Sequence, residues 1–221
     1  MAPKIIYFPV RGRAEVMKLA LAAVEQEFEF VQVDYADMKA HPDQYPFGQC
    51  PRLVDGDIDL VQSNAILRYL ARHYKLYGKD EKEMGLVDMI MEGVESLRVK
   101  YLALVYQEKL ADAAMEQHWS THCDPNNAEH RNGGAHLVFF SRLLQRNAAG
   151  GGKAFVGSGL SMADLCVFDI VDLHNRIFPD KMKEVYPELV AFHDHVASLP
   201  GIKEYLASPK RVAAVNGNNL G

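Results

Sequence analysis

The strongest constraint on the fold is a change of sequence pattern near residue 76. Before it, short apolar runs alternate with helical patterns, which predicts strands and helices within one domain. The segment 75–82 is charged and contains a glycine, and after it only helical periodicity remains. We therefore predict an α+β domain at residues 1–76 and an all-helical domain at residues 83–221.

The first domain is predicted to contain a mixed sheet with helices. Strands are expected at 4–8 and 28–33, on either side of a helical pattern at 15–24, and this β–α–β order favours a parallel pair. Asp55-Gly56 separates two further apolar segments and is typical of a β-hairpin, whose strands are antiparallel. Four strands of mixed direction follow from this pattern.

The second domain is predicted to be built from helices joined by irregular segments. Residues 119–135 should form an irregular connection, and 209–221 should form a tail. Ser161 and Asp164 have the spacing of a capping box before an apolar run, which predicts a helix start. Further helices are predicted at 83–115, 137–146 and 188–198.

Composition excludes several classes of function. The chain has 221 residues and a net charge of −5, with no dense basic run, so nucleic acid and anionic membranes are not expected as partners. No apolar stretch has the length of a membrane span and no signal peptide is recognisable, so a cytoplasmic location is expected. The three cysteines are far apart and include no Cys-x-x-Cys pair.

Tyr7 is the first candidate functional residue, because it ends a predicted strand just before the turn Arg11-Gly12-Arg13. Small ligands bind at such strand ends in α/β folds. Two interpretations remain open: a buried aromatic ring with a satisfied hydroxyl, or a hydrogen-bond donor to a ligand anion. If that anion is a thiolate, a hydrogen bond from the tyrosine hydroxyl worth ~1.5–3 kcal/mol lowers the thiol pKa by roughly one to two pKa units.

Two other junctions offer polar groups in the same domain. Ser63, preceded by Gln62, stands between a strand and a helical pattern, where it serves either as a plain N-cap or as part of an anion site. Cys50-Pro51 precedes a strand and is either an ordinary loop proline or a cis bond that leaves the backbone of Cys50 to pair with a peptide ligand. Cys50 itself is interpreted as an apolar filler.

The stretch 118–136 is rich in histidine. Its potential ligands match no standard zinc spacing, so no metal site is predicted there. They are His118, His122, Cys123, His130 and His136.

Taken together, these motifs make the sequence resemble the cytosolic glutathione S-transferases over essentially its whole length. The resemblance is greatest to the pi class, with sigma-like features. The segments that carry it are Tyr7-Phe8-Pro9-Val10-Arg11-Gly12-Arg13, Phe47-Gly48-Gln49-Cys50-Pro51, Gln62-Ser63-Asn64-Ala65-Ile66 and Ser161-Met162-Ala163-Asp164.

This resemblance implies a thioredoxin-like N-terminal domain, a helical C-terminal domain and a homodimer. It implies that Tyr7 is catalytic and donates to the glutathione sulfur, with Arg13 nearby, and that Phe47 contacts the partner subunit. Glutathione would be held by Gln49, Cys50, Pro51, Gln62 and Ser63, and the electrophile by Phe8, Val10, Arg11 and Tyr106.

The activity implied is the conjugation of glutathione, as a co-substrate, to small hydrophobic electrophiles in detoxification, with no other cofactor and no metal. A glutathione-dependent isomerase or peroxidase of sigma type is an alternative, and so is a non-catalytic binding protein. The sequence departs from the family at Met38 and Pro42, where a tryptophan and a lysine normally bind the glycyl end of glutathione. Lys39 or His41 are candidates to replace them.

Overall fold

The computed structural model describes residues 2–127 and 135–221, which form two compact units. The first unit contains the chain up to Leu76 together with Ala197–Asn219. The second contains Tyr77–Val196 and the last two residues, Leu220 and Gly221. The C-terminal stretch 197–219 therefore belongs with the α+β unit, whereas the sequence pattern placed it in a helical domain at 83–221.

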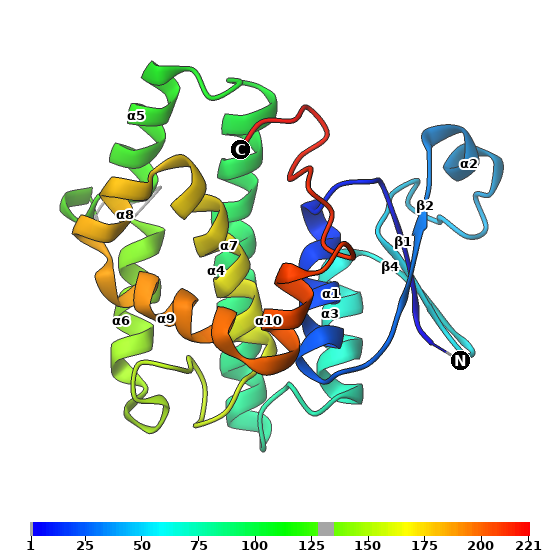
Figure 1. Cartoon of the computed structure of the whole chain (residues 1–221), viewed down its shortest axis with the longest axis horizontal. Coiled ribbons are helices and arrows are strands. Elements are labelled where there is room, and N and C mark those ends of the chain that lie inside the picture. The colour runs from blue at the N-terminus through cyan, green and yellow to red at the C-terminus, as the bar shows by residue number, and fades with distance from the viewer. Residues whose placement is uncertain (1, 128–134) are drawn as a thin grey trace. The chain divides into compact units, whose positions relative to one another are not determined.

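The sheet of the first unit is four-stranded and mixed, as predicted (Figure 1). Its strands are β1 (Lys4–Tyr7), β2 (Glu29–Gln32), β3 (Arg52–Asp55) and β4 (Ile58–Val61), in the order β2-β1-β3-β4. β1 and β2 are parallel, with Ile5 opposite Phe30, while β3 is antiparallel to both β1 and β4. The β–α–β order and the Asp55-Gly56 hairpin thus produce the expected directions.

Two helices of the first unit pack against α1, whose buried residues are mostly apolar. α1 contacts both α3 and α10. A Cβ atom on Gly201 would lie 2.1 Å from the carbonyl oxygen of Ala22, so only glycine lets α10 approach α1 this closely. The helices are α1 (Glu15–Ala23), α2 (Tyr35–Ala40), α3 (Ser63–His73) and α10 (Pro200–Ala207), with a 3-10 turn at Gly12–Ala14.

The C-terminal segment after α10 packs against the loop that follows β1, so it is not the free tail that the sequence predicted. The backbone N–H of Arg11 donates to the carbonyl of Ala214 at 2.9 Å, and that of Gly12 donates to Val215 at 3.1 Å. Val215 and Asn216 are buried. The C-terminal segment therefore supports a loop from the opposite end of the chain.

The second unit is helical, and its long helix α4 packs along α7. The predicted capping box is confirmed, because Ser161 and Asp164 make both of its reciprocal bonds at the start of α7. Its helices are α4 (Glu81–Tyr106), α5 (Asp112–His122), α6 (His136–Arg146), α7 (Met162–Ile177), α8 (Pro179–Val185) and α9 (Pro187–Ser198), with 3-10 turns at Pro125–Asn127 and Ala148–Gly150.

Two predictions for this unit are wrong. The expected single helix at 83–115 is divided, because Lys109 and Leu110 take left-handed conformations with φ of 52° and 56° between α4 and α5. The expected irregular connection at 119–135 begins inside a helix, since α5 continues to His122. The rest of that prediction falls partly on residues 128–134, which lie outside the described residues.

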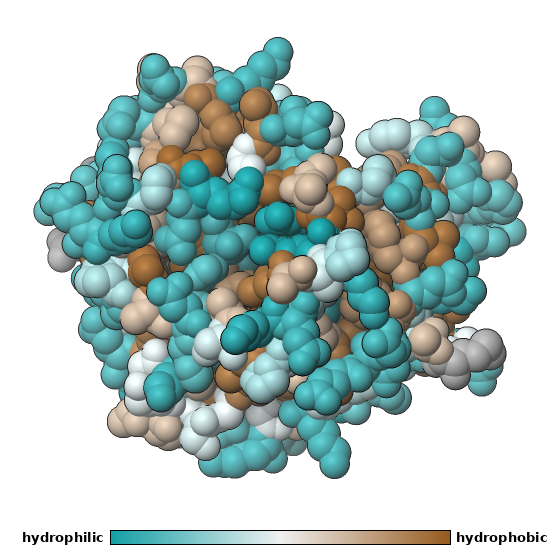
Figure 2. Space-filling view, viewed as in Figure 1, coloured by the Kyte–Doolittle hydropathy of each residue, from teal (hydrophilic) through white to brown (hydrophobic). Residues whose placement is uncertain are grey.

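No helix among the described residues has both the length and the apolar character needed to cross a bilayer. On the face drawn in Figure 2, hydrophilic residues cover most of the surface and hydrophobic residues show in smaller patches between them.

Candidate functional site

Tyr7 lies at the end of β1 with 8% of its surface exposed. The backbone N–H of Arg13 donates to its hydroxyl oxygen at 3.2 Å. A Cβ atom on Gly12 would lie 2.7 Å from that oxygen, and Gly12 has a φ of +40°. Glycine at this position therefore allows the phenol to approach the turn and meet the N–H group.

Arg13 connects this turn to the start of α3. Its Nη1 donates to the Oγ of Ser63 at 3.4 Å. Ser63 is the first residue of α3 and not its N-cap, which is Gln62 with a φ of 71° and no capping bond from its side chain. The plain N-cap interpretation of Ser63 is therefore wrong, while its position at a helix N-terminus, where anions are favoured, is as expected.

The loop before β3 meets the same junction. The side-chain Nε2 of Gln62 donates to Oε1 of Gln49 at 3.0 Å. The peptide bond between Cys50 and Pro51 is cis, which agrees with the second of the two interpretations of this dipeptide. Gln49 and Gln62 are 13 positions apart in the sequence yet lie side by side, at the edge of the sheet where β1 and β4 end and β3 begins.

The Cys50 thiol is not suited to act as a nucleophile. Burial raises its pKa to about 11, so it is protonated at neutral pH. The residue packs against an apolar cluster of Val33, Met38 and Tyr45. The structure therefore supports its interpretation as an apolar filler.

The region expected to bind the glycyl end of glutathione contains no direct replacement for the missing tryptophan. Met38 is 5% exposed and belongs to the apolar cluster, whereas Pro42 is exposed. The ring Nδ1 of His41 donates to the backbone carbonyl of Asp37 at 2.9 Å, and Lys39 is exposed in the last turn of α2. Lys39 and His41 stay candidates for this role.

The residues predicted to face the electrophile lie in both units. Phe8 is half-buried, and its ring centroid lies 5.6 Å from that of Tyr7 and 5.1 Å from that of Tyr35. The Nε of Arg11 donates to the carbonyl of Val212 at 2.8 Å. Val10, which precedes Arg11 in the sequence, is partly exposed.

In the second unit, Tyr106 ends α4 and is 46% exposed. Phe47, the predicted dimer contact, lies in the first unit and is 67% exposed. The two residues therefore keep the accessibility that their predicted roles need.

Sequence reasoning missed two neighbours of this site. Tyr35, which packs on Phe8, was not singled out from the sequence, although its aromatic ring was a signal. The segment 212–215, which binds Arg11 and Gly12 through its carbonyls, carries no side-chain pattern that could have revealed it. A backbone contact of this kind is independent of side-chain type.

The first unit thus gathers a phenol, a guanidinium, a serine hydroxyl and two carboxamides around a strand end and a helix start. This set can hydrogen-bond an extended anionic peptide and place a hydroxyl donor against one of its groups. No side chain of the set supplies a nucleophile of its own at neutral pH, so a nucleophile would come from the ligand.

Comparison with known proteins matches both units to one family. The family model described as "Glutathione S-transferase, N-terminal domain" matches residues 3–72, and that described as "Glutathione S-transferase, C-terminal domain" matches residues 98–209. The chain is 38% identical over 223 residues to glutathione S-transferase P of Capra hircus, covering 97% of this chain and 96% of the relative.

Solved structures agree with this match. The pi-class glutathione S-transferase of Onchocerca volvulus is 35% identical with a TM-score of 0.82, covering 100% of both chains. The sigma-class enzyme of Fasciola hepatica is 26% identical with a TM-score of 0.78, covering 96% of this chain and 97% of that one. The chain therefore belongs to the glutathione S-transferase family, as a transferase enzyme most similar to the pi class.

Proposed function

We propose that this glutathione S-transferase uses Tyr7 to stabilise the glutathione thiolate and conjugates it to small hydrophobic electrophiles. The observation that carries the proposal is the bond from the Arg13 N–H to the Tyr7 hydroxyl oxygen, 3.2 Å long. A hydroxyl that accepts a hydrogen bond becomes a stronger donor through its own O–H, because the two bonds polarise each other. The turn therefore both positions and strengthens the donor.

The reaction needs only the thiolate and the electrophile. Donation from Tyr7 brings a thiol of pKa about 8.5 toward neutrality, which raises the fraction present as the nucleophile. The sulfur then forms a bond to the electrophilic carbon. In a substitution the leaving group departs with its bonding electron pair, and in an addition the product takes up a proton. Glutathione is a co-substrate in this proposal and no further cofactor takes part.

The peptide part of glutathione is assigned to the residues that surround the α3 start. Gln62 and Ser63 receive the γ-glutamyl end, where the helix N-terminus favours a carboxylate. Gln49 and the backbone of Cys50, before cis-Pro51, pair with the extended peptide. Arg13, which already reaches Ser63, supplies positive charge beside that end.

The electrophile is assigned to Phe8, Val10 and Arg11 of the first unit. The ring of Phe8 offers apolar contact to a hydrophobic substrate, while the guanidinium of Arg11 can interact with a polar substituent. We propose a detoxifying role in the cytoplasm.

We further propose that the enzyme is a homodimer in which Phe47 enters a second copy of the chain. The exposed ring would bury apolar area by entering an apolar hollow, and the second unit has one of about 320 Å³. Its lining includes Met89, Gly93 and Phe139. A Phe47→Ala variant should sediment as a monomer at concentrations where an Ile58→Ala control, which also removes an exposed apolar side chain, stays dimeric.

The test of the chemistry compares two tyrosine variants. Tyr7→Phe should lose about 100-fold or more in kcat/KM toward a chlorodinitrobenzene, in the range typical of lost transition-state donors. It should still be retained on immobilised glutathione. Tyr69→Phe removes a hydroxyl that donates to Asp55 in the same unit and should keep full activity.

Full activity in Tyr7→Phe would contradict the proposed role of the hydroxyl. Failure of the wild-type protein both to bind glutathione and to turn over the substrate would favour a non-catalytic binding protein. Turnover of hydroperoxides or isomerisable substrates in place of the chlorodinitrobenzene would favour the sigma-type alternative.

A further inference from the structure

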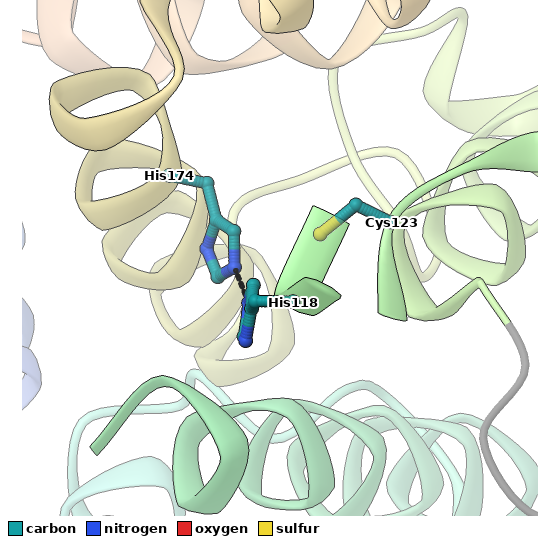
Figure 3. A group of neighbouring side chains, drawn as sticks. All are labelled: His118, Cys123 and His174. Carbon is teal, nitrogen blue, oxygen red and sulfur yellow. Dashed lines mark hydrogen bonds between the residues drawn. The ribbon is translucent and has the colours of Figure 1, made fainter. Parts of the chain in front are cut away.

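We propose that the second unit contains a transition-metal site, of the kind that binds Zn²⁺, formed by His118, Cys123 and His174. These residues come from α5, from the position just after it, and from α7. Figure 3 shows the three side chains pointing toward one another. Each offers one potential ligand atom, and the three atoms all lie within 4.8 Å of one another.

The distance between the two histidines fits a shared ion. Their Nε2 atoms are 3.3 Å apart. Two nitrogens bound to one tetrahedral Zn²⁺ at ~2.0–2.1 Å each are separated by about 3.3 Å. The backbone therefore already holds the two rings at the separation that a common metal ion requires.

His174 is also oriented as a metal ligand. Its Nδ1 lies 2.8 Å from the backbone carbonyl of Ile170, and because a carbonyl can only accept, this ring nitrogen carries the hydrogen. The Nε2 of His174 therefore has its lone pair directed at the cluster. Metal-binding histidines typically donate their second ring N–H to a carbonyl or carboxylate in this way.

Burial keeps both rings in the form that binds metals. Desolvation holds the pKa of His118 well below its usual range and lowers that of His174 to about 4, so both are neutral at pH 7. Burial also raises the pKa of Cys123, which stays a thiol without metal. Metal binding would form the metal–sulfur bond, release the thiol proton to solvent and move the ring hydrogen of His118 to Nδ1.

A simple hydrogen bond between two buried histidines explains only part of this arrangement. It accounts neither for the sulfur beside the pair nor for His122, whose buried Nδ1 has no hydrogen-bond partner among the described residues. His122 follows His118 by one helical turn, and their ring centroids are 5.2 Å apart. A further imidazole thus lies beside the cluster on the same helix face, although it is not one of the three residues whose ligand atoms lie within 4.8 Å of one another.

The donors select the class of metal. Two imidazoles and a thiolate favour Zn²⁺ and similar first-row ions, whereas Mg²⁺ and Ca²⁺ prefer oxygen ligands. The cluster is buried, with at most 5% of each residue exposed, which is typical of a structural site. Such an ion would tie α5 to α7 and has no part in the reaction proposed for Tyr7.

Cobalt titration of the whole, metal-free protein tests the site. After dialysis against a chelator, wild type should bind one Co²⁺ per chain and show a sulfur-to-cobalt charge-transfer band with tetrahedral d–d bands, and Zn²⁺ should abolish both. Cys123→Ala should lose the charge-transfer band and bind Co²⁺ at least ~100-fold more weakly, because even outer-shell changes cost about 10–100-fold. Cys166→Ala is the matched control, since this buried cysteine of α7 lies outside the cluster.

Absence of Co²⁺ uptake by the wild-type protein would overturn the proposal without any variant. Identical spectra and affinities for Cys123→Ala and Cys166→Ala would overturn it as well. Should Cys123→Ala not fold, His118→Gln replaces it, with a loss of d–d intensity and affinity as the expected result and an unchanged spectrum as the contrary one.

Discussion

The polar side chains around Tyr7 and the Arg98–Asp169 pair of the second unit differ in their burial. Around Tyr7, the side chains of Arg13, Gln49, Gln62 and Ser63 are partly or fully exposed and pair at 3.0–3.4 Å. In the second unit, Arg98 and Asp169 are 8% and 5% exposed and pair at 2.7 Å.

This difference in burial predicts that the residues around Tyr7 serve ligand binding, whereas the Arg98–Asp169 pair serves the stability of the fold. Exposed side chains in long hydrogen bonds can exchange partners when a ligand arrives, at little cost in desolvation. A buried ion pair cannot lose one member without leaving a charge in an apolar environment. Substitutions around Tyr7 should therefore change activity more than the free energy of unfolding, and substitutions at Arg98 or Asp169 should do the reverse.

Lys18 shows that the first unit also contains buried charged residues. It is fully buried on α1, and its Nζ has no hydrogen-bond partner among the described residues, lying instead 3.6 Å from the centre of the Phe30 ring. Burial lowers its pKa to about 8, although the nearby Glu15 acts in the opposite direction. The buried Lys18 ammonium is in a situation like that of the Arg98 guanidinium if Asp169 were removed.

The largest effect is expected for Asp169→Asn, which keeps the shape of the side chain and removes its charge. It should lower the free energy of unfolding by about 3–5 kcal/mol, because Arg98 remains buried without its counter-charge. Glu116→Gln, which breaks the exposed pair with Lys181, should cost less than about 1 kcal/mol. Urea denaturation at pH 7 measures both, and equal losses would remove the distinction between buried and exposed pairs.

Lys18→Met should raise the free energy of unfolding at pH 7 by roughly 2–3 kcal/mol, since each pKa unit of depression corresponds to about 1.36 kcal/mol. In the wild type, the unfolded chain holds more protons than the folded one between pH 8 and 10.5, so stability rises with pH across that window. The advantage of the variant should therefore shrink above pH 8.

Urea denaturation of wild type and Lys18→Met at pH 7, 9 and 10 follows this change. Lys4→Met, which removes an exposed lysine paired with Glu29, serves as the control and should be nearly neutral at each pH. A constant difference between wild type and Lys18→Met would show that the Lys18 ammonium is not destabilised by burial.

Gly12→Ala should reduce kcat/KM by about 10–100-fold, because the added Cβ would lie 2.7 Å from the Tyr7 hydroxyl and displace it. Gly56→Ala is a matched control. Gly56 also has a positive φ, +58°, but nothing lies within 4 Å of its Cβ position. Both variants place alanine at a positive φ, so steady-state kinetics should show a loss for Gly12→Ala alone, and equal losses would point to backbone strain.

Ser63→Ala should have the smallest effect. Loss of one hydrogen bond of about 1 kcal/mol predicts a rise in KM for glutathione of roughly 5-fold, with little change in kcat. Ser208→Ala, which removes a hydroxyl bonded to the backbone of Tyr205, should leave both constants unchanged. A fall in kcat at unchanged KM would place Ser63 in the chemical step instead.

The sequence predicted the local structure around Tyr7 well, because short-range rules determine it. Tyr7, Gly12 and Arg13 lie in one short turn, and a strand followed by a turn and a helix leaves few alternatives for their arrangement. The hairpin at Asp55-Gly56 and the capping box at Ser161 were equally predictable, since both depend on neighbours within four residues.

Errors arose where local signals have two meanings. No helix was predicted after 188–198, yet proline is favoured in the first turn of a helix and α10 begins at Pro200. The turn between α4 and α5 uses Lys109 and Leu110 in left-handed conformations, which no residue-type preference predicts.

The sequence by itself determined the class of fold, the strand directions and the turn that presents Tyr7, because hydrophobic periodicity and turn chemistry act over a few residues. Only the tertiary structure showed that residues 212–215 support this turn and that His174 meets His118 and Cys123. These contacts join positions more than 50 residues apart. They follow from the packing of whole helices, which local patterns do not encode.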